Sequence, residues 1–280
     1  GWFEETGPRC QIQFSIMDNI ATLYLDTSGA GLHKRGYRAN ANEAPLRETL
    51  AAAMVHLSRY RGRGEFLDPF CGSGTIPIEA AMIAMNRAPG LARSFDAEKW
   101  ACIDPELWRQ GREQALDVIY RDRCYDICGS DIDPACVELS AENAKKAGVE
   151  HTVRFETRDA CTLRLDRREG TLICNPPYGE RMMDVASARK LLRNFGTTAS
   201  RSPMKQYIIS SDEKFEEFFG VKADKKRKLY NGMLRCNLFM YYQPPEKRKR
   251  FRSFANTKNN KKKVQKNRNN RPNKRFEGHS

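Results

Sequence analysis

The chain has 280 residues, of which 40% are hydrophobic and 30% charged, and it carries a formal net charge of +14. This length gives room for one α/β domain with a sizeable core plus extensions, since single domains commonly reach about 200 to 250 residues. No apolar run approaches the roughly 18 residues of a membrane-spanning helix, and the nine cysteines form no C-x-x-C pair, so neither a membrane span nor a zinc site nor a disulfide framework is supported.

The first elements are two short strands and a helix. Gln11 to Ser15 and Ala21 to Asp26 are predicted as strands that pair through a turn at Asp18-Asn19. Between Glu43 and Tyr60, apolar residues recur at the spacing of one helix face, namely Leu46, Leu50, Ala53, Met54 and Leu57. We therefore expect an amphipathic helix ahead of the main sheet.

A Gly-rich turn follows. Gly64 to Thr75 predicts a short buried strand, a turn and the start of a helix that continues to Ala84. Such a turn at the carboxyl end of a strand is where open α/β sheets bind nucleotides. The turn is neither a P-loop nor a dinucleotide fingerprint, because no Lys follows its second glycine and the spacing is not G-x-G-x-x-G. The missing lysine argues against a triphosphate. The residues of this turn that are candidates for cofactor binding are Asp68, Pro69, Phe70, Cys71, Gly72, Gly74 and Thr75; Cys71 is expected to fit the turn rather than to act as a nucleophile.

The next two strands each end beside an acid. Tyr125 to Asp131 reads as a strand, after which a helix runs from about Pro134 to Ala147 and stops at Gly148. An acid at that strand end can accept both ribose hydroxyls, and Asp131 is the preferred candidate. Asp133 is the second candidate, although it is equally well explained as the cap of the helix. Thr152 to Glu156 predicts a third strand; after it, Asp159 either accepts from an adenine amine or lies in an ordinary loop.

The sequence Asn175-Pro176-Pro177-Tyr178 follows the apolar run Thr171 to Cys174 and pairs an amide with two fixed prolines and an aromatic ring. Aromatic amines of bases are poor nucleophiles, and two acceptors aimed at their hydrogens would favour an available lone pair. The Asn175 side-chain oxygen and the Pro176 carbonyl are suitable acceptors, and Tyr178 offers a ring on which a base could stack. Four such residues alone also suit a plain Pro-Pro turn. Their position after the Gly-rich turn and the Asp131 strand favours an amine-binding site.

The remaining elements complete the predicted sheet. Lys205 to Ser210 predicts a further strand, and Asp212 to Phe219 a short helix capped by Asp212. Lys225 to Tyr230 and Arg235 to Tyr242, separated by Asn231-Gly232, predict a closing hairpin. An insertion spans residues 88 to 123, with a helix from Pro105 to Tyr120.

The end of the chain is strongly basic. Residues 244 to 280 contain fourteen Lys or Arg against two Glu, which accounts for +12 of the net charge. With few apolar residues this segment cannot offset the entropy of ordering, so we expect a disordered tail. Cations gain affinity for phosphates by releasing counterions, which favours an RNA tether over a merely solubilising tail.

Three motifs in this order, Asp68 to Thr75, Gly129 to Asp131 and Asn175 to Met182, resemble those of class I S-adenosylmethionine-dependent N-methyltransferases. More narrowly, Asp26 to Gly29, Leu32 to Arg38 and Glu43 to Leu50 are similar to the THUMP-associated RNA guanine-N2 methyltransferases of the ribosomal RNA large subunit methyltransferase L type. The likeness covers about residues 1 to 243.

The resemblance implies a Rossmann-like α/β fold with a seven-stranded, mostly parallel sheet that ends in an antiparallel hairpin. It implies that residues 1–38 are a remnant of an N-terminal RNA-binding region and linker, that 39–243 form the catalytic domain, and that 244–280 are the tail. The chain is then expected to lack most of the THUMP module and to be a cytoplasmic protein. Its implied cofactor is S-adenosylmethionine, with S-adenosylhomocysteine as product and no metal. The implied cofactor-binding set adds Asp131, Ile132, Asp133, Asp159, Ala160 and Asn175 to the Gly-rich turn, and the catalytic set is Asn175, Pro176, Pro177 and Tyr178.

The implied activity is methylation of a guanine N2 amine in RNA, with 23S ribosomal RNA as the expected substrate. The amine would attack the methyl carbon in line, and the product would lose its proton afterwards without a side-chain base. The alternatives are an adenine-N6 methyltransferase acting on DNA or RNA, a protein glutamine methyltransferase, and a non-catalytic RNA-binding protein that retains the fold. The sequence leaves the oligomeric state and the modified nucleotide open.

Overall fold

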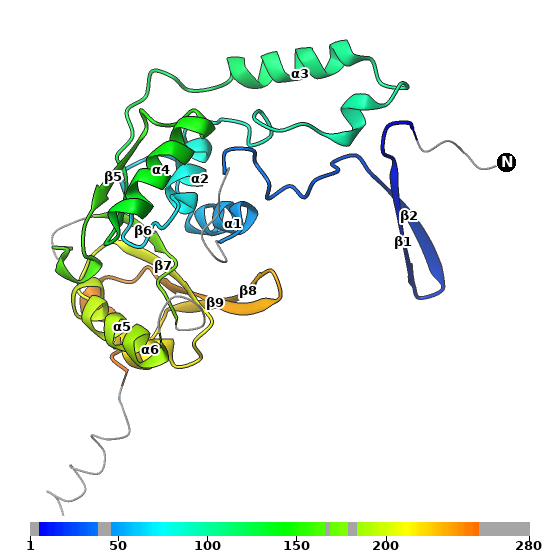
Figure 1. The fold of residues 1–280 in the computed structure, drawn as a ribbon. Coiled ribbons are helices and arrows are strands. Elements are labelled where there is room, and N and C mark those ends of the chain that lie inside the picture. Colours follow the sequence, from blue (N-terminus) through cyan, green and yellow to red (C-terminus); the bar gives the residue numbers. More distant parts are fainter. Residues whose placement is uncertain (1–5, 39–45, 166–168, 179–183, 252–280) are drawn as a thin grey trace, which may run out of the picture.

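Seven strands form one twisted sheet at the centre of the molecule (Figure 1). The computed structural model describes residues 6–38, 46–165, 169–178 and 184–251. The spatial order of the strands is β5-β4-β3-β6-β7-β9-β8. In chain order they are β3 (Glu65–Asp68), β4 (Ile127–Asp131), β5 (Val153–Thr157), β6 (Gly170–Cys174), β7 (Lys205–Ser210), β8 (Lys225–Asn231) and β9 (Leu234–Tyr241). Strands β3 to β7 run parallel, whereas β9 is antiparallel to both β7 and β8. This arrangement confirms the predicted α/β fold, its mostly parallel sheet and its antiparallel hairpin.

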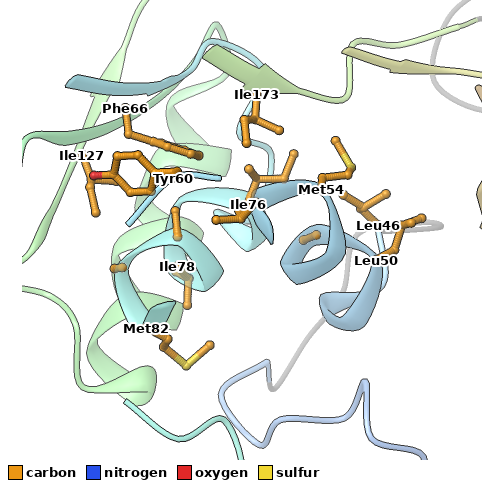
Figure 2. Close-up of a cluster of buried hydrophobic side chains, with 14 of the residues drawn as sticks. Leu46, Leu50, Met54, Tyr60, Phe66, Ile76, Ile78, Met82, Ile127 and Ile173 are labelled. Carbon is orange, nitrogen blue, oxygen red and sulfur yellow. The ribbon is translucent and has the colours of Figure 1, made fainter. Parts of the chain in front are cut away.

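Helices cover both faces of the sheet. One face packs against α1 (Glu48–Ser58), α2 (Thr75–Ala84) and α4 (Pro134–Ala147), and the other against α5 (Val185–Ala199) and α6 (Phe215–Phe219). Successive strand residues alternate between these cores, so Phe66 lies in the first and Leu67 in the second. Figure 2 shows the first core, where Phe66 lies beside Tyr60 and Met54 lies between Leu46 and Ile76. Burial on both faces explains why the strands read as continuous apolar runs.

The helix boundaries agree with the sequence where local signals set them. Helix α4 spans Pro134 to Ala147 as predicted, because Asp133 caps its start and Gly148 ends it in the left-handed conformation. Helix α1 begins five residues later than predicted. Arg47 keeps an extended backbone, and Leu46 is buried in the core ahead of the helix. An apolar residue that packs just before a helix has the same spacing as one in the first turn of the helix. The sequence pattern therefore does not show whether Leu46 lies inside the helix or ahead of it.

The cap predicted at Asp212 is wrong. Helix α6 begins at Phe215 after Lys214 and has no side-chain cap. Asp212 accepts from the Lys214 N–H at 2.9 Å, in the turn ahead of the helix, and pairs with Arg189 of α5, whose Nε lies 2.9 Å from the Asp212 carboxylate. The carboxylate thus supports the turn before α6 and also forms a long-range ion pair, which the local pattern does not predict.

The N-terminal strands form a hairpin of their own, apart from the main sheet (Figure 1). β1 (Gln11–Met17) and β2 (Ile20–Asp26) pair through Asp18 and Asn19, both with positive φ, so the predicted turn is confirmed. The insertion contains the 3-10 helix η1 (Asp96–Lys99) and α3 (Pro105–Asp117), which ends three residues earlier than predicted. The buried Arg93 links insertion and hairpin base by donating to the carbonyls of Ser28 and Gly31 at 3.0 Å.

The packed body extends past both boundaries expected for the catalytic domain. Tyr37, placed in the N-terminal region by the sequence, is almost fully buried in the first core. At the other end, Arg248 is buried and donates to the carbonyls of Ser200 and Met204 at 3.1 Å. Residues 244–251 thus pack on the body, whereas residues 252–280 of the expected tail lie outside the described residues.

The described ranges contain no helix with both the length and the apolar character needed to cross a membrane. In those same ranges, no three His, Cys, Asp or Glu side chains gather so as to hold a metal ion.

Candidate functional site

The predicted site residues follow three neighbouring strands. The Gly-rich turn leaves β3, Asp131 ends β4 and Asn175 follows β6, and these strands are adjacent in the order β4-β3-β6. Because all three run parallel, their carboxyl ends meet at one edge of the sheet. The fold thus brings together three motifs that are well separated in sequence, from Asp68 in the first to Tyr178 in the last.

The Gly-rich turn requires glycine at two positions. Gly72 and Gly74 have φ values of 53° and 79°, in the left-handed region. A Cβ at Gly74 would lie 3.0 Å from the Cβ of Ser140, whereas one at Gly72 would meet nothing within 4 Å. Helix α4 braces the turn, since Ser140 donates to the Gly72 carbonyl at 2.7 Å and Asn143 to the Ser73 carbonyl at 3.0 Å. The backbone is held from one side and open at Gly72.

Asp131 is attached directly to this turn. Its Oδ2 accepts from the Gly72 backbone N–H at 3.0 Å, and its Oδ1 accepts from the Asp133 N–H at 3.1 Å. A carboxylate offers about four acceptor positions, so capacity for further donors remains. The neighbouring Ile132 is 69% exposed and presents an apolar face at the same edge. Asp133 caps α4 by accepting from the Ala135 N–H at 2.9 Å, as its structural explanation predicted.

Asp68 and Cys71 are buried within the turn. Burial raises the pKa of Asp68 well above its usual value, and the charge of Asp131 adds to this shift. One Asp68 oxygen accepts from the Phe70 N–H at 3.1 Å, and the other has no hydrogen-bond partner among the described residues. Burial likewise raises the pKa of the Cys71 thiol, with the charge of Asp68 contributing, which disfavours a reactive thiolate. Phe70 packs edge-on against Phe195 of α5, with ring centroids 5.1 Å apart.

Asn175 presents an unusual acceptor. Its side-chain oxygen is buried and has no hydrogen-bond partner in the described part of the chain. A buried amide oxygen without a partner is destabilising by roughly 1–3 kcal/mol, so such atoms are rare unless a ligand satisfies them. Pro176 is buried, and Pro177 and Tyr178 are partly exposed; residues 179–183, which include the end of this motif, lie outside the described residues.

Asp159 and Ala160 lie after β5, beyond Asp131 along the same edge. The Arg158 N–H donates to the Asp131 carbonyl at 2.8 Å, which links the ends of β4 and β5. Asp159 accepts from the Cys161 N–H at 2.8 Å and so caps the 3-10 helix η2 (Ala160–Thr162), while Ala160 is buried. Both residues are therefore near the other candidates in the sheet, and Asp159 also has a local structural role.

A buried cluster of charges beneath the turn was not anticipated from the sequence. Arg38 donates to the Thr75 hydroxyl at 2.5 Å, at the first residue of α2, and its Nε lies 3.7 Å from Glu48. One turn further along α2, Glu79 accepts from the Tyr37 hydroxyl at 3.2 Å and pairs with Arg35 at 3.4 Å. Burial raises the pKa of Glu79 to about 7, although Arg35 opposes the shift. A single carboxylate within the apolar sequence of α2 was the available signal.

A separate hollow of about 470 Å³ lies in the insertion, lined mainly by Leu91, Phe95, Ile103, Leu107 and Trp108. None of the predicted site residues lines it. The edge of the sheet therefore remains the candidate site.

Sequence comparison places the chain among methyltransferases. A sequence profile described as an RMKL-like methyltransferase domain matches residues 35–239. The chain is 39% identical over 251 residues to YpsC of Bacillus subtilis, which is named as a candidate RNA methyltransferase. The aligned region covers 89% of this chain and 65% of YpsC. The chain is 38% identical over 240 residues to ribosomal RNA large subunit methyltransferase K/L of Legionella pneumophila, which covers 83% of this chain and 34% of that protein. The chain thus spans less than two thirds of these relatives.

Solved structures give the same picture. A candidate methyltransferase solved with S-adenosylhomocysteine is 41% identical and superimposes with a TM-score of 0.78, covering 85% of this chain and 63% of the other. A Listeria monocytogenes protein named, by prediction, as an N6-adenine-specific DNA methylase is 42% identical with a TM-score of 0.79, covering 86% and 62%.

Proposed function

Because the chain belongs to the family of RMKL-like methyltransferase domains, we propose that it transfers a methyl group from S-adenosylmethionine to the N2 amine of a guanine in RNA, with 23S ribosomal RNA as substrate. The single observation that carries the amine chemistry is the buried Asn175 oxygen at the end of β6, which has no hydrogen-bond partner among the residues that the structure describes. An acceptor at that place is satisfied by the N–H of an entering amine.

The cofactor is assigned to the edge formed by the Gly-rich turn and Asp131. Three features of the chain fit S-adenosylmethionine: the open backbone at Gly72, the remaining acceptor capacity of Asp131, and the exposed apolar side chain of Ile132. Asp131 would accept the ribose hydroxyls and Ile132 would pack on the adenine. When bound, the cofactor supplies an electrophilic methyl group on a sulfonium. In support, a relative that is 41% identical was solved with S-adenosylhomocysteine.

The residues after β6 act on the acceptor base. Asn175 Oδ1 and the Pro176 carbonyl accept the two amine hydrogens, which orients the nitrogen lone pair toward the methyl group, and Tyr178 stacks on the base. Held in this way, the amine would be positioned to accept the methyl group, with S-adenosylhomocysteine as the leaving group and the surplus N–H proton passing to water. Cys71 takes no part, since burial keeps its thiol protonated. No metal enters the scheme.

The choice of RNA rests on the names of the relatives and on the basic residues at the end of the chain. YpsC and the Legionella enzyme are named for RNA, the latter for ribosomal RNA of the large subunit. We assign the ten Lys and Arg of residues 252–280 to a sequence-blind RNA tether, because basic chains bind polyanions by counterion release. Adenine N6 is the second candidate acceptor, favoured by the name of the Listeria protein.

The test is methylation of 23S RNA transcribed in vitro, followed by mass spectrometry of its nucleosides. N2-methylguanosine is the expected product. N6-methyladenosine as the only product would support methyl transfer but would show that the acceptor is adenine N6 and not guanine N2. No methylated nucleoside, with S-adenosylhomocysteine binding intact by calorimetry, would favour a non-catalytic RNA-binding protein.

A further inference from the structure

The hairpin of β8 and β9 projects beyond the edge of the sheet that carries Asn175 (Figure 1). Cys174 pairs with Ile208, which pairs with Phe239, and the hairpin closes five residues further on at Leu234. At about 3.3 Å per residue, its tip lies about 16 Å past the level of Cys174, and β9 lies two strand spacings, about 10 Å, to the side. We call residues 228–237 the arm. The arm thus overhangs the flank of the candidate site.

One face of the arm anchors it to the body. Leu229 and Leu234 pack against the core that contains α1, and Cys236 is buried in that core. At the tip, the Asn231 side-chain oxygen accepts from the Arg47 N–H at 3.4 Å, directly before α1. Gly232, with a φ of 65°, begins the two-residue turn, as in a type II′ hairpin. The arm is therefore attached to the body along its length.

The opposite face of the arm is basic, aromatic and exposed. Tyr230 lies directly across from Arg235, and Lys228 across from Asn237, so all four side chains share this face. Phe239 on the same face belongs to the core with α5 and α6, which places Tyr230 and Arg235 on the α5 side of the sheet. Helix α5 is the helix that follows Asn175 along the chain. The exposed face therefore lies on the α5 side of the sheet, and the arm extends past the same edge of the sheet at which β6 ends.

The charges of this face are available. Among the described residues, neither Lys228 nor Arg235 forms an ion pair, whereas Lys226 at the base of β8 is paired with Glu216 at 2.8 Å. β8 is an edge strand, and cations on an edge strand commonly prevent pairing with other chains. That role explains Lys225 and Arg227 but not a Tyr230 that is 57% exposed, nor a Met233 at the tip that is 99% exposed. Aromatic and apolar groups beside free cations fit a nucleic acid strand, which supplies both phosphates and base faces.

We propose that Lys228, Tyr230 and Arg235 bind the RNA strand next to the nucleotide that enters the candidate site. Lys228 and Arg235 contact phosphates, and the Tyr230 ring stacks on an unpaired base. This inference rests on the proposed function, and it assigns a substrate-binding surface outside the three motifs.

The experiment compares matched charge removals in the 280-residue chain. The arm variant is Lys228→Ala with Arg235→Ala, and the control is Lys225→Ala with Lys145→Ala, which removes two exposed cations outside the arm, one of them in the last turn of α4. Binding of 23S RNA transcribed in vitro is measured at several salt concentrations, together with S-adenosylhomocysteine affinity and the methylation rate. The arm variant is expected to bind RNA at least about ten-fold more weakly with a shallower salt slope, whereas the control stays within two-fold. Its KM for RNA rises and its kcat at saturating RNA stays near the parent's.

Tyr230 is tested separately. Tyr230→Ala is expected to weaken RNA binding at least about five-fold, and Tyr230→Phe, which keeps the ring, to stay within two-fold. Cofactor affinity close to that of the parent shows in each variant that the domain is folded. If the parent methylates RNA and the arm variants match it in affinity, KM and salt slope, the inference is overturned while the proposed function stands. If the parent binds cofactor but neither binds nor methylates RNA, both fail together.

Discussion

The Gly72 backbone N–H donates to Asp131 Oδ2 at 3.0 Å and joins the ends of two adjacent strands. The acid is thereby oriented before any ligand arrives, and the turn is held at the position where a Cβ would meet no other atom. A preoriented acceptor loses less freedom when it binds a diol.

Replacing Asp131 should therefore affect the cofactor more than the fold. Asp131→Ala is expected to weaken S-adenosylhomocysteine binding at least about ten-fold in calorimetry, because both the ribose acceptor and the support of Gly72 are lost. The control is Asp133→Ala, which removes the cap of α4. Loss of a cap costs about 1 kcal/mol, so the control should lower the melting temperature by about 2 to 4 °C and leave affinity unchanged. If the parent and Asp131→Ala bound S-adenosylhomocysteine with equal affinity, the assignment of Asp131 to the cofactor site would be wrong.

Asn175 should matter to transfer and not to cofactor binding. Its side-chain oxygen forms no hydrogen bond within the described ranges, so Asn175→Ala is expected to keep the fold and hold cofactor affinity within a few-fold. The rate of methyl transfer should fall at least about 100-fold, as when one polarising group is removed from other active sites. Single-turnover transfer measures this directly. A variant as fast as the parent would refute the assignment of Asn175.

Cys71 should be dispensable despite its place in the turn. Its thiol is buried, faces the Ser140 hydroxyl at 3.7 Å, and has a raised pKa. Cys71→Ala is expected to keep methyl transfer within about three-fold of the parent. Iodoacetamide should alkylate the exposed Cys10, Cys102 and Cys124 well before Cys71, as read by peptide mass spectrometry. Rapid alkylation of Cys71 in the folded protein would contradict this.

Glu79 should make stability fall with rising pH. Its pKa is about 7 in the folded protein, against about 4.3 in an unfolded chain. Between these values the folded state binds more protons than the unfolded state, so stability decreases as pH rises from about 4.5 to 7. Glu79→Gln keeps a partner for Tyr37 and cannot titrate.

As pH rises across that range the parent should lose unfolding free energy and the variant should not. The difference in unfolding free energy should therefore change in favour of the variant by up to about 3 kcal/mol. Urea unfolding at pH 5 and pH 7.5 measures the change. If the difference in unfolding free energy between variant and parent were the same at both pH values, Arg35 would be keeping Glu79 charged throughout this range.

The basic end of the chain should set salt sensitivity rather than target choice. A chain that ends at Phe251 lacks ten Lys and Arg, and its RNA affinity is expected to depend less steeply on salt. The methylated nucleotide should remain the same, as judged by nucleoside mass spectrometry. If the shortened chain had the same salt slope as the full chain, residues 252–280 would not act as an RNA tether.

The motifs could be found from the sequence because each depends on neighbouring residues. Gly72 and Gly74 predict a turn, and Asp133 and Gly148 predict the two ends of α4. Neither prediction needs a contact with residues that are distant in sequence. Tyr37 and Glu79 are different, since their bond joins residues 42 apart and depends on how the linker packs on α2. The same holds for Asp212, whose partner Arg189 lies on another helix. The Asn175 side-chain oxygen, which has no hydrogen-bond partner in the described part of the chain, is buried by the surrounding core, and its motif alone does not predict this.

The last described residues determine where the basic end of the chain begins. The Phe251 N–H donates to the Gly220 carbonyl at 2.9 Å, and Val221 bridges to Arg250, just ahead of β8. The arm lies at the opposite end of that strand, about 25 to 30 Å away at 3.3 Å per residue. An RNA that contacted both places would be held bivalently, so release of either contact would leave the other to keep the local RNA concentration high. Rebinding would then compete with dissociation, and residence time would exceed what either contact gives alone.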